Sequence, residues 1–237
     1  MRVREWELGT YMQNQAGYDT VHSSPIICWG AKGQAKVLRE FLPALGYQLL
    51  ACFDNDTRLG SPFEDVPLVG GWNDFEQWRS RNPGSVACIV AIGGQNGCER
   101  LEIQHRLQSA GLTPVTLVHP KAFVARTASL GMGTQILAMS AVCADAKIGD
   151  GCIVNTRASV DHECRIGNGV HVGPGATLCG EVSVADCAFV GAGATVLPRV
   201  NIGRGAIVGA GALVSRDVSP ESCVVGIPAR VQVKSRD

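Results

Sequence analysis

One histidine stands between two acids in the run "VNTRASVDHECRIG" (residues 154–167), where Asp161, His162 and Glu163 are consecutive. An imidazole titrates near neutral pH and can take a proton from a nucleophile. A carboxylate within reach stabilises the imidazolium and fixes its tautomer, and either Asp161 or Glu163 can supply that carboxylate. The run is a candidate for general base chemistry. The alternative interpretation is an exposed histidine with no catalytic role.

A second candidate is the turn Gly30-Ala31-Lys32-Gly33, which follows an apolar run and precedes an acid, Asp54. The turn lacks the G-x-G-x-x-G spacing of dinucleotide sites, which disfavours an oxidoreductase. Gly33 begins a predicted helix whose free N–H groups can hold an anion. Asp54 ends a predicted strand at the place where related folds contact a ribose. Lys32 either binds a diphosphate or is a solvated lysine.

The second half of the chain has a repeat of six residues. From position 118 to position 214, every sixth residue is Val, Ile or Leu, which gives seventeen positions without a slip. This period fits neither a helix nor a plain amphipathic strand, but it fits short strands joined by corners, three to a coil. The repeat therefore predicts a parallel β-helix whose coils stack.

Two details of the repeat bear on the site and the corners. Positions one coil from His162 hold Ala144 and Gly180, so the repeat itself does not require a histidine. Glycine follows the aliphatic residue seven times, as at Gly149 and Gly167. These glycines are predicted to supply the unusual backbone angles of tight corners.

The first half alternates predicted strands and helices. Strands are expected over residues 26–29, 48–53 and 85–92, and helices over residues 36–45 and 99–110, before residues 113–118 lead into the first coil. This order predicts a parallel sheet with right-handed crossovers. The predicted divisions are an N-terminal arm (1–24), an α/β domain (25–117) and the β-helix (118–237).

The composition excludes several classes of function. Lys plus Arg and Asp plus Glu both number 21 among 237 residues, so no net field favours nucleic acid or an anionic membrane. The sequence shows neither a secretory signal nor a run of about 18 apolar residues that would cross a membrane. Its ten cysteines are scattered without a C-x-x-C pair, so most are expected to be buried thiols in a reducing cytoplasm.

The two halves together resemble a family of bacterial acetyltransferases that modify sialic acids or nucleotide-linked amino sugars, including bacillosamine and perosamine N-acetyltransferases. The likeness covers residues 26–232. The matching segments are Gly30–Gly33, Phe53–Asn55, Ala91–Gly93, Asn155–Thr156, Asp161–Cys164, Gly173–Ala176 and Gly226–Ala229. The resemblance implies a Rossmann-like sugar-nucleotide-binding domain followed by a left-handed β-helix of hexapeptide repeats. It also implies a cytoplasmic homotrimer with active sites between subunits, working in surface polysaccharide or glycoprotein biosynthesis.

The resemblance further implies an N-acetyltransferase that uses acetyl-CoA as cosubstrate, needs no metal, and acetylates the amino group of a nucleotide-linked sugar. A 4-amino-4,6-dideoxy sugar is expected. In this resemblance His162 is the catalytic base and Glu163 is the acid that raises its basicity. The substrate contacts it implies are Lys32, Gly33, Gln34, Asp54, Asn55 and Gly93, and the acetyl-CoA contacts are His171, Ala192 and Ala210.

One residue departs from the family pattern: Gln34 stands where the family commonly has histidine. Glutamine can form hydrogen bonds but cannot carry a proton or a charge near neutral pH. A role of that histidine in catalysis predicts a slower enzyme here, whereas a role in holding the sugar predicts a changed specificity.

Three other functions compete with this interpretation. O-acetylation of sialic acid or a related sugar would use the same His162. A non-catalytic sugar-nucleotide-binding scaffold would need neither His162 nor Glu163. A metal-dependent hydratase, as in γ-class carbonic anhydrases, needs three imidazoles around one metal. The β-helix offers only His119, His162 and His171, and His119 lies in the first repeat.

Overall fold

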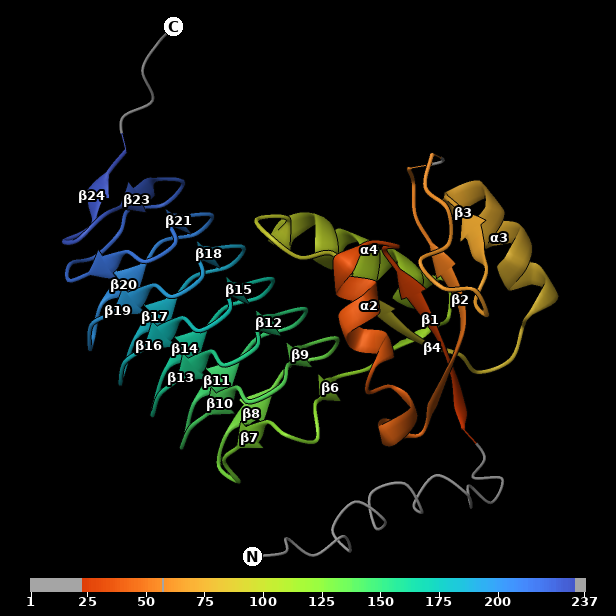
Figure 1. Ribbon diagram of the computed structural model, residues 1–237, viewed down its shortest axis with the longest axis horizontal. Helices are drawn as coiled ribbons and strands as arrows, with labels where there is room; N and C mark the ends of the chain where they lie inside the picture. Colours follow the sequence, from red (N-terminus) through yellow and green to blue (C-terminus); the bar gives the residue numbers. More distant parts are fainter. Residues whose placement is uncertain (1–22, 57, 233–237) are drawn as a thin grey trace, which may run out of the picture.

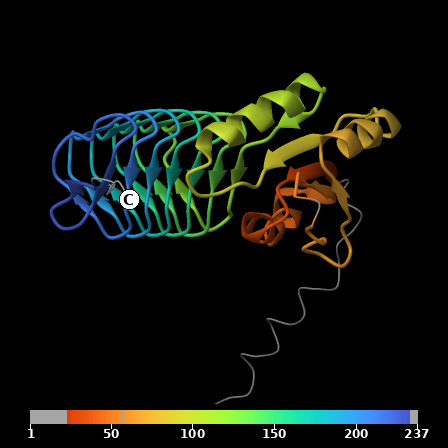
Figure 2. The ribbon, with the colours of Figure 1, turned by 90° about the horizontal axis from the view of Figure 1, so that it is seen from above.

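The computed structural model describes residues 23–56 and 58–232, which form an α/β domain followed by a β-helix (Figure 1). The α/β domain lies beside the first coils of the β-helix, and helix α4 (Gly97–Ser109) extends along the coils in the view of Figure 2. The predicted arm, residues 1–24, falls outside the described residues except for its last two positions. Among the described residues, no helix has the length and apolar character needed to cross a membrane.

The α/β domain is built on a five-stranded parallel sheet of strand order β3-β2-β1-β4-β5. One face packs against α2 (Gly33–Arg39), through Ala35 and Leu38. The other packs against α3 (Trp72–Arg81) and α4, through Phe75 and Leu107. Both faces are buried, which is why β1 and β4 read as continuous apolar runs. The strands are β1 (Ser24–Trp29), β2 (Tyr47–Phe53), β3 (Leu68–Gly70), β4 (Ala87–Val90) and β5 (Thr113–Pro114).

Some helices of this domain differ from the prediction. The predicted helix over 36–45 is α2 (Gly33–Arg39) followed by a separate 3₁₀ turn (Pro43–Leu45), because Pro43 lacks the N–H that would continue an α-helix. Strand β3 and helix α3 (Trp72–Arg81) had no prediction. Strand β3 is only three residues long, too short for a periodic signal.

The β-helix confirms the repeat prediction. Each aliphatic residue of the six-residue series is the second residue of a two-residue strand. Each strand between residues 117 and 196 pairs in parallel with the strand eighteen residues on, as Lys147–Ile148 does with Arg165–Ile166. The strands form three faces, named here by their first strands. The β6 face contains β6, β9, β12, β15, β18, β21, β23 and β24; the β7 face contains β7, β10, β13, β16, β19 and β22; the β8 face contains β8, β11, β14, β17 and β20.

The strand bounds follow the six-residue step through β22. They are Leu117–Val118 (β6), Phe123–Val124 (β7), Ser129–Leu130 (β8), Gln135–Ile136 (β9), Ala141–Val142 (β10), Lys147–Ile148 (β11), Ile153–Val154 (β12), Ser159–Val160 (β13), Arg165–Ile166 (β14), His171–Val172 (β15), Thr177–Leu178 (β16), Ser183–Val184 (β17), Phe189–Val190 (β18), Thr195–Val196 (β19), Asn201–Ile202 (β20), Ile207–Val208 (β21), Leu213–Val214 (β22), Cys223–Val225 (β23) and Arg230–Val231 (β24).

The corner glycines act differently from the prediction. Positive φ angles occur two residues later, for example at Gly151 (φ 59°) and Gly169 (φ 66°), whereas Gly149 and Gly167 have none. A Cβ at Gly167 would lie 2.7 Å from the backbone nitrogen of Asp186, and one at Gly149 would lie 2.8 Å from that of Asn168. Where glycine follows the aliphatic residue, as at Gly149 and Gly167, it therefore allows close stacking on the next coil.

The α/β domain covers part of the β6 face. Leu117 and Ile153 on that face belong to the same buried cluster as Ala35 and Leu38 of α2. Arg100 of α4 is fully buried at the junction, although the structure gives it no carboxylate partner among the described residues. Its guanidinium donates to the carbonyl of Ile92 in the α/β domain and to those of Gly151 and Gly169 in the β-helix, at 2.6–2.8 Å.

A disulfide crosses the same junction. Cys98 at the start of α4 pairs with Cys187 at a β-helix corner, with a Cα–Cα distance of 5.3 Å. The other eight cysteines are free, and five of them are buried thiols, which is half of the ten rather than the expected majority. The two paired cysteines stand 89 residues apart, a separation that carries no sequence signal.

Candidate active site

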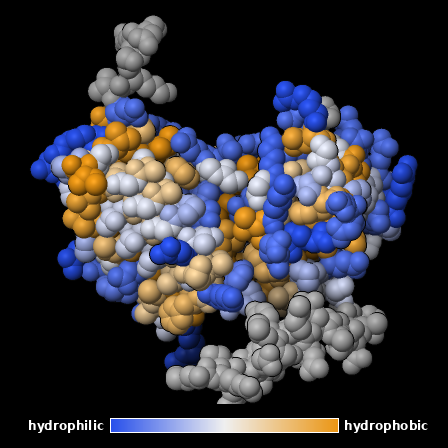
Figure 3. Space-filling model, in the orientation of Figure 1, coloured by the Kyte–Doolittle hydropathy of each residue, from blue (hydrophilic) through white to orange (hydrophobic). Residues whose placement is uncertain are grey.

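A cavity of about 500 Å³ opens at the carboxyl ends of β1 and β4, where the α/β domain meets the β-helix. The surface is hollowed between the two units in the space-filling view, with mostly hydrophilic side chains over the α/β domain (Figure 3). Ligands of open parallel sheets bind at this edge. Five of the six predicted substrate contacts line the cavity, namely Lys32, Gly33, Gln34, Asp54 and Gly93.

The sixth predicted substrate contact, Asn55, lies outside the cavity lining. It is exposed, and its Oδ1 atom faces Gly71, where a Cβ would approach it to 3.1 Å. Its role in substrate binding stays a prediction.

The turn after β1 is shaped by Gly30 and Asp54. Gly30 has φ 107°, and a Cβ there would lie 2.6 Å from the carbonyl oxygen of Ala91. Asp54 accepts hydrogen bonds from the backbone N–H of Ala31 (3.0 Å) and of Asp56 (2.9 Å), one on each carboxylate oxygen. Both oxygens of Asp54 therefore hold the backbone of the two loops that form the cavity.

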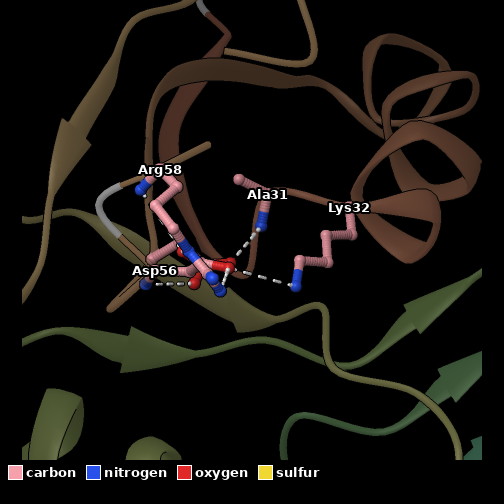
Figure 4. Close-up of polar contacts among 5 residues, drawn as sticks. Ala31, Lys32, Asp56 and Arg58 are labelled. Carbon is pink, nitrogen blue, oxygen red and sulfur yellow. Dashed lines mark hydrogen bonds and ion pairs between the residues drawn. The ribbon is translucent and has the colours of Figure 1, made fainter. Parts of the chain in front are cut away.

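Charged side chains gather beside this turn. Arg58 binds Asp56 through two hydrogen bonds of 2.8 and 3.0 Å, and Lys32 Nζ lies 3.7 Å from the same carboxylate (Figure 4). These contacts, those of Arg58 first, lower the pKa of Asp56 to about 2. One carboxylate thus stands between two cations, and Lys32 keeps a mostly exposed side chain. Asp56 and Arg58 were not predicted from the sequence as site residues.

His171 forms part of the cavity wall from the β-helix side. It is the first residue of β15 and is only 5% exposed. Its Nδ1 lies 3.2 Å from the carbonyl oxygen of Gly94, and its Nε2 lies 3.0 Å from the amide nitrogen of Asn155. Since the Asn155 Oδ1 accepts from the N–H of Thr156, its Nδ2 must be the donor to His171. His171 is therefore a neutral imidazole with its proton on Nδ1.

Burial, followed by the charge of Arg100, lowers the pKa of His171 to about 4. Its Nε2 lone pair is already used by Asn155, so His171 has no free nitrogen with which to accept a substrate proton. His171 lies with the predicted substrate contacts, whereas Ala192 and Ala210 are exposed at corners that follow β18 and β21. The assignment of all three residues to acetyl-CoA stays a prediction.

His162 and Glu163 lie at a different place, the corner between β13 and β14, where the β7 and β8 faces meet. His162 is half exposed, and its Nδ1 lies 3.2 Å from Glu163 Oε2. Asp161 instead accepts the backbone N–H of His162 at 2.8 Å. Of the two acids that the sequence offered, Glu163 therefore contacts the imidazole and Asp161 holds the turn.

The second nitrogen of His162 faces Gly180, one coil further on. A Cβ at position 180 would lie 2.4 Å from His162 Nε2. The repeat position that looked neutral in the sequence therefore has a specific use, because only glycine leaves room for the ring. The arrangement keeps Nδ1 engaged by a carboxylate and directs Nε2 along the corner, a geometry suited to taking a proton.

No cluster of three or more His, Cys, Asp or Glu side chains able to hold a metal ion is found in residues 23–56 and 58–232.

Comparison with known proteins gives both a family and solved structures. Residues 145–180 match the family model described as bacterial transferase hexapeptide (six repeats). Perosamine N-acetyltransferase PerB from Caulobacter crescentus, solved with CoA and GDP-perosamine, is 36% identical with a TM-score of 0.81, over 89% of this chain and 98% of that one. A comparison with curated protein sequences finds no match.

Two further structures agree. The acetyltransferase domain of PglB from Neisseria gonorrhoeae, solved with acetyl coenzyme A, is 30% identical with a TM-score of 0.79, over 89% of this chain and 100% of that one. WeeI from Acinetobacter baumannii is 27% identical with a TM-score of 0.78 over the same shares. The chain thus belongs to the left-handed β-helix family of hexapeptide-repeat sugar N-acetyltransferases that includes the Caulobacter perosamine enzyme.

Proposed function

We propose that this protein transfers the acetyl group of acetyl-CoA to the amino group of a nucleotide-linked amino sugar, with His162 as general base. The observation that carries the proposal is the His162–Glu163 pair, whose imidazole has one nitrogen held by a carboxylate and the other directed toward Gly180. The similarity to a perosamine N-acetyltransferase that binds CoA and GDP-perosamine supports the reaction and the two substrates.

The proposed chemistry balances with one histidine. The neutral amine attacks the thioester carbonyl carbon, a C–N bond forms, and the C–S bond to CoA breaks. His162 Nε2 takes the proton that the amine loses and returns it to the CoA sulfur, while Glu163 stabilises the imidazolium. A well-placed general base of this kind contributes about 10²–10⁴-fold to a rate.

The cavity supports a nucleotide sugar as acceptor. It is open at the carboxyl edge of the sheet, and its lining includes the glycine turns Gly30–Gly33 and Gly93–Gly94. Lys32 is the exposed cation beside it and is proposed to contact the diphosphate. The cavity volume, about 500 Å³, is within the usual range for small-molecule sites.

We also propose a homotrimer with active sites between subunits. His162 is not among the residues that line the cavity of its own chain, and it lies on another edge of the β-helix from His171. An active site that contains both the cavity and the base is therefore proposed to take its His162 from a second copy.

The test is thiol release from acetyl-CoA across UDP-, GDP- and dTDP-linked 4-amino sugars. We expect release with one sugar and a loss of at least about 10²-fold in kcat for His162→Ala. Gly180→Ala should also lower kcat, because its Cβ would displace the ring, whereas Gly84→Ala, where a Cβ would meet nothing within 4 Å, should not. Thiol release that His162→Ala leaves intact, or silence with every amino sugar, contradicts the proposal.

A further inference from the structure

A chain of two side-chain amides crosses from the β-helix to the cavity. Gln135, the first residue of β9, is fully buried, and its Nε2 donates to the carbonyl oxygen of Val90 at 2.8 Å. Gln34, at the start of α2, donates from its own Nε2 to Gln135 Oε1 at 2.7 Å. The hydrogen bonds therefore run from Gln34 through Gln135 to the end of β4.

The chemistry of the chain fixes the orientation of both amides. A backbone carbonyl only accepts hydrogen bonds, so Gln135 must direct its NH₂ group toward Val90 and its oxygen toward Gln34. The Gln135 oxygen likewise only accepts, so Gln34 must direct its NH₂ group toward it. Flipping either amide would place two acceptors or two donors against each other. The oxygen of Gln34 is left for the cavity.

The oxygen of Gln34 faces Gly93 and His171. A Cβ built on Gly93 would lie 3.9 Å from Gln34 Oε1 and 3.6 Å from His171 Cε1. Gln34 and His171 both line the cavity, and no hydrogen bond to Gln34 Oε1 is found among the described residues. Both ring nitrogens of His171 are already paired, with Gly94 and Asn155. This part of the wall thus presents one unpaired acceptor.

We propose that Gln34 Oε1 accepts a hydrogen bond from the amino group of the bound sugar, and that Gln135 is the positioning residue that holds it in that orientation. The inference rests on the proposed function. A histidine at position 34 could present either a donor or an acceptor, whereas the oriented glutamine presents only an acceptor. The cavity of this chain therefore selects a sugar with an N–H donor and disfavours one with a carbonyl at the same position.

The experiment compares Gln34→Met, Gln135→Met and the double variant. Calorimetry measures binding of the accepted 4-amino sugar nucleotide and of its 4-keto counterpart, and kinetics give kcat and both KM values. The matched control is Gln104→Met, since Gln104 is also buried and bonds a β-helix carbonyl, that of Met132, but does not line the cavity. Thermal unfolding verifies that each variant is folded.

We expect Gln34→Met to weaken binding of the amino sugar by about tenfold, as for one lost hydrogen bond, without weakening the 4-keto sugar. Gln135→Met should raise KM for the amino sugar with KM for acetyl-CoA unchanged, and the double variant should be no weaker than Gln34→Met. Gln104→Met should bind both sugars as the unaltered enzyme does.

Several results would overturn the inference. If Gln34→Met binds the amino sugar with unchanged affinity, in an enzyme that acetylates it, the hydrogen bond from the sugar amino group to Gln34 is ruled out. The proposed function is then unaffected. Equal weakening of both sugars assigns Gln34 to another part of the ligand. If the two substitutions weaken binding of the amino sugar additively, Gln135 does not act by positioning Gln34. Failure of the unaltered enzyme to acetylate any amino sugar contradicts the proposed function and this assignment together.

Discussion

At the residue scale, two histidines differ in their burial and in their hydrogen bonds. His162 is half exposed and contacts Glu163 through Nδ1, and no hydrogen bond to its Nε2 is found within residues 23–56 and 58–232. His171 is buried, and both of its nitrogens are paired. The same residue type is therefore the proposed base at one position and a buried, uncharged part of a cavity wall at the other.

Burial of neutral His171 predicts a pH-dependent stability. Its pKa is about 4 in the folded protein, below the ordinary histidine value of 6.5, so the unfolded chain binds this proton at higher pH than the folded chain does. Its contribution is fully present above pH 6.5 and is lost as the pH falls toward 4. Between pH 7.5 and 4.5 we expect a loss of about 2–3 kcal/mol in the free energy of unfolding.

Chemical denaturation at the two pH values measures this loss. His171→Gln should reduce it, whereas His105→Gln, which alters an exposed histidine of α4, should leave it unchanged. An identical pH dependence in His171→Gln and the unaltered protein would contradict the prediction.

At the element scale, α4 joins the two units. Arg100 reaches three carbonyls on three different segments, and the Cys98–Cys187 disulfide joins the start of the same helix to the β-helix. Burial lowers the pKa of Arg100 to about 10, a cost offset by the three short hydrogen bonds. The loop at Ile92–Gly94, which forms part of the cavity, is held by this arginine at its first residue.

Arg100→Lys is therefore expected to destabilise the protein. A lysine keeps the charge but cannot present the planar array of donors, so at least one buried carbonyl loses its partner, at a cost of about 2–3 kcal/mol. Urea denaturation followed by tryptophan fluorescence measures this, because Trp29, Trp72 and Trp78 all lie in the α/β domain.

Arg106→Lys is the matched control on the same helix. Arg106 is half exposed and pairs with Glu76. Its guanidinium also lies over the Trp72 ring, 3.8 Å from the centroid, so its replacement should cost no more than about 1 kcal/mol. Equal losses in the free energy of unfolding from the two substitutions would show that the buried hydrogen bonds of Arg100 contribute no more to stability than the surface contacts of Arg106.

The sequence allowed the β-helix to be predicted almost residue by residue, because each inward aliphatic follows from a period of six. It also placed Lys32, Gly33, Gln34 and Asp54 together, since they follow neighbouring parallel strands. It could not predict the contacts of Gln135 or Arg100, which look like an ordinary repeat residue and an ordinary helical arginine. Their roles arise only where the two units pack together, and no local pattern encodes that packing.

At the scale of the whole molecule, the cavity and His162 lie on different parts of one chain. In the proposed trimer, each cavity is completed by the base of a neighbour. The assembly is expected to have three times the 25.0 kDa chain mass, which light scattering measures.

Subunit mixing tests shared active sites more directly. His162→Ala removes the base, and Gly93→Phe fills the cavity, because a Cβ at Gly93 points toward Gln34 and His171. Each variant alone should be inactive, whereas trimers assembled from equal amounts of both should recover about a quarter of the normal activity. Mixed trimers as inactive as either parent would mean that each chain uses its own His162.

The stacking of coils also gives the β-helix a regular spacing along its axis. Strands from β6 to β19 pair with partners eighteen residues further on. An insertion or deletion of eighteen residues among them leaves every later side chain on its own face and shifts it along the axis by one coil, about 4.8 Å. A change of six residues instead turns all later residues onto the next face. The chain can therefore lengthen by whole coils while Gln135 and His171 stay on the β6 face and His162 stays at its corner.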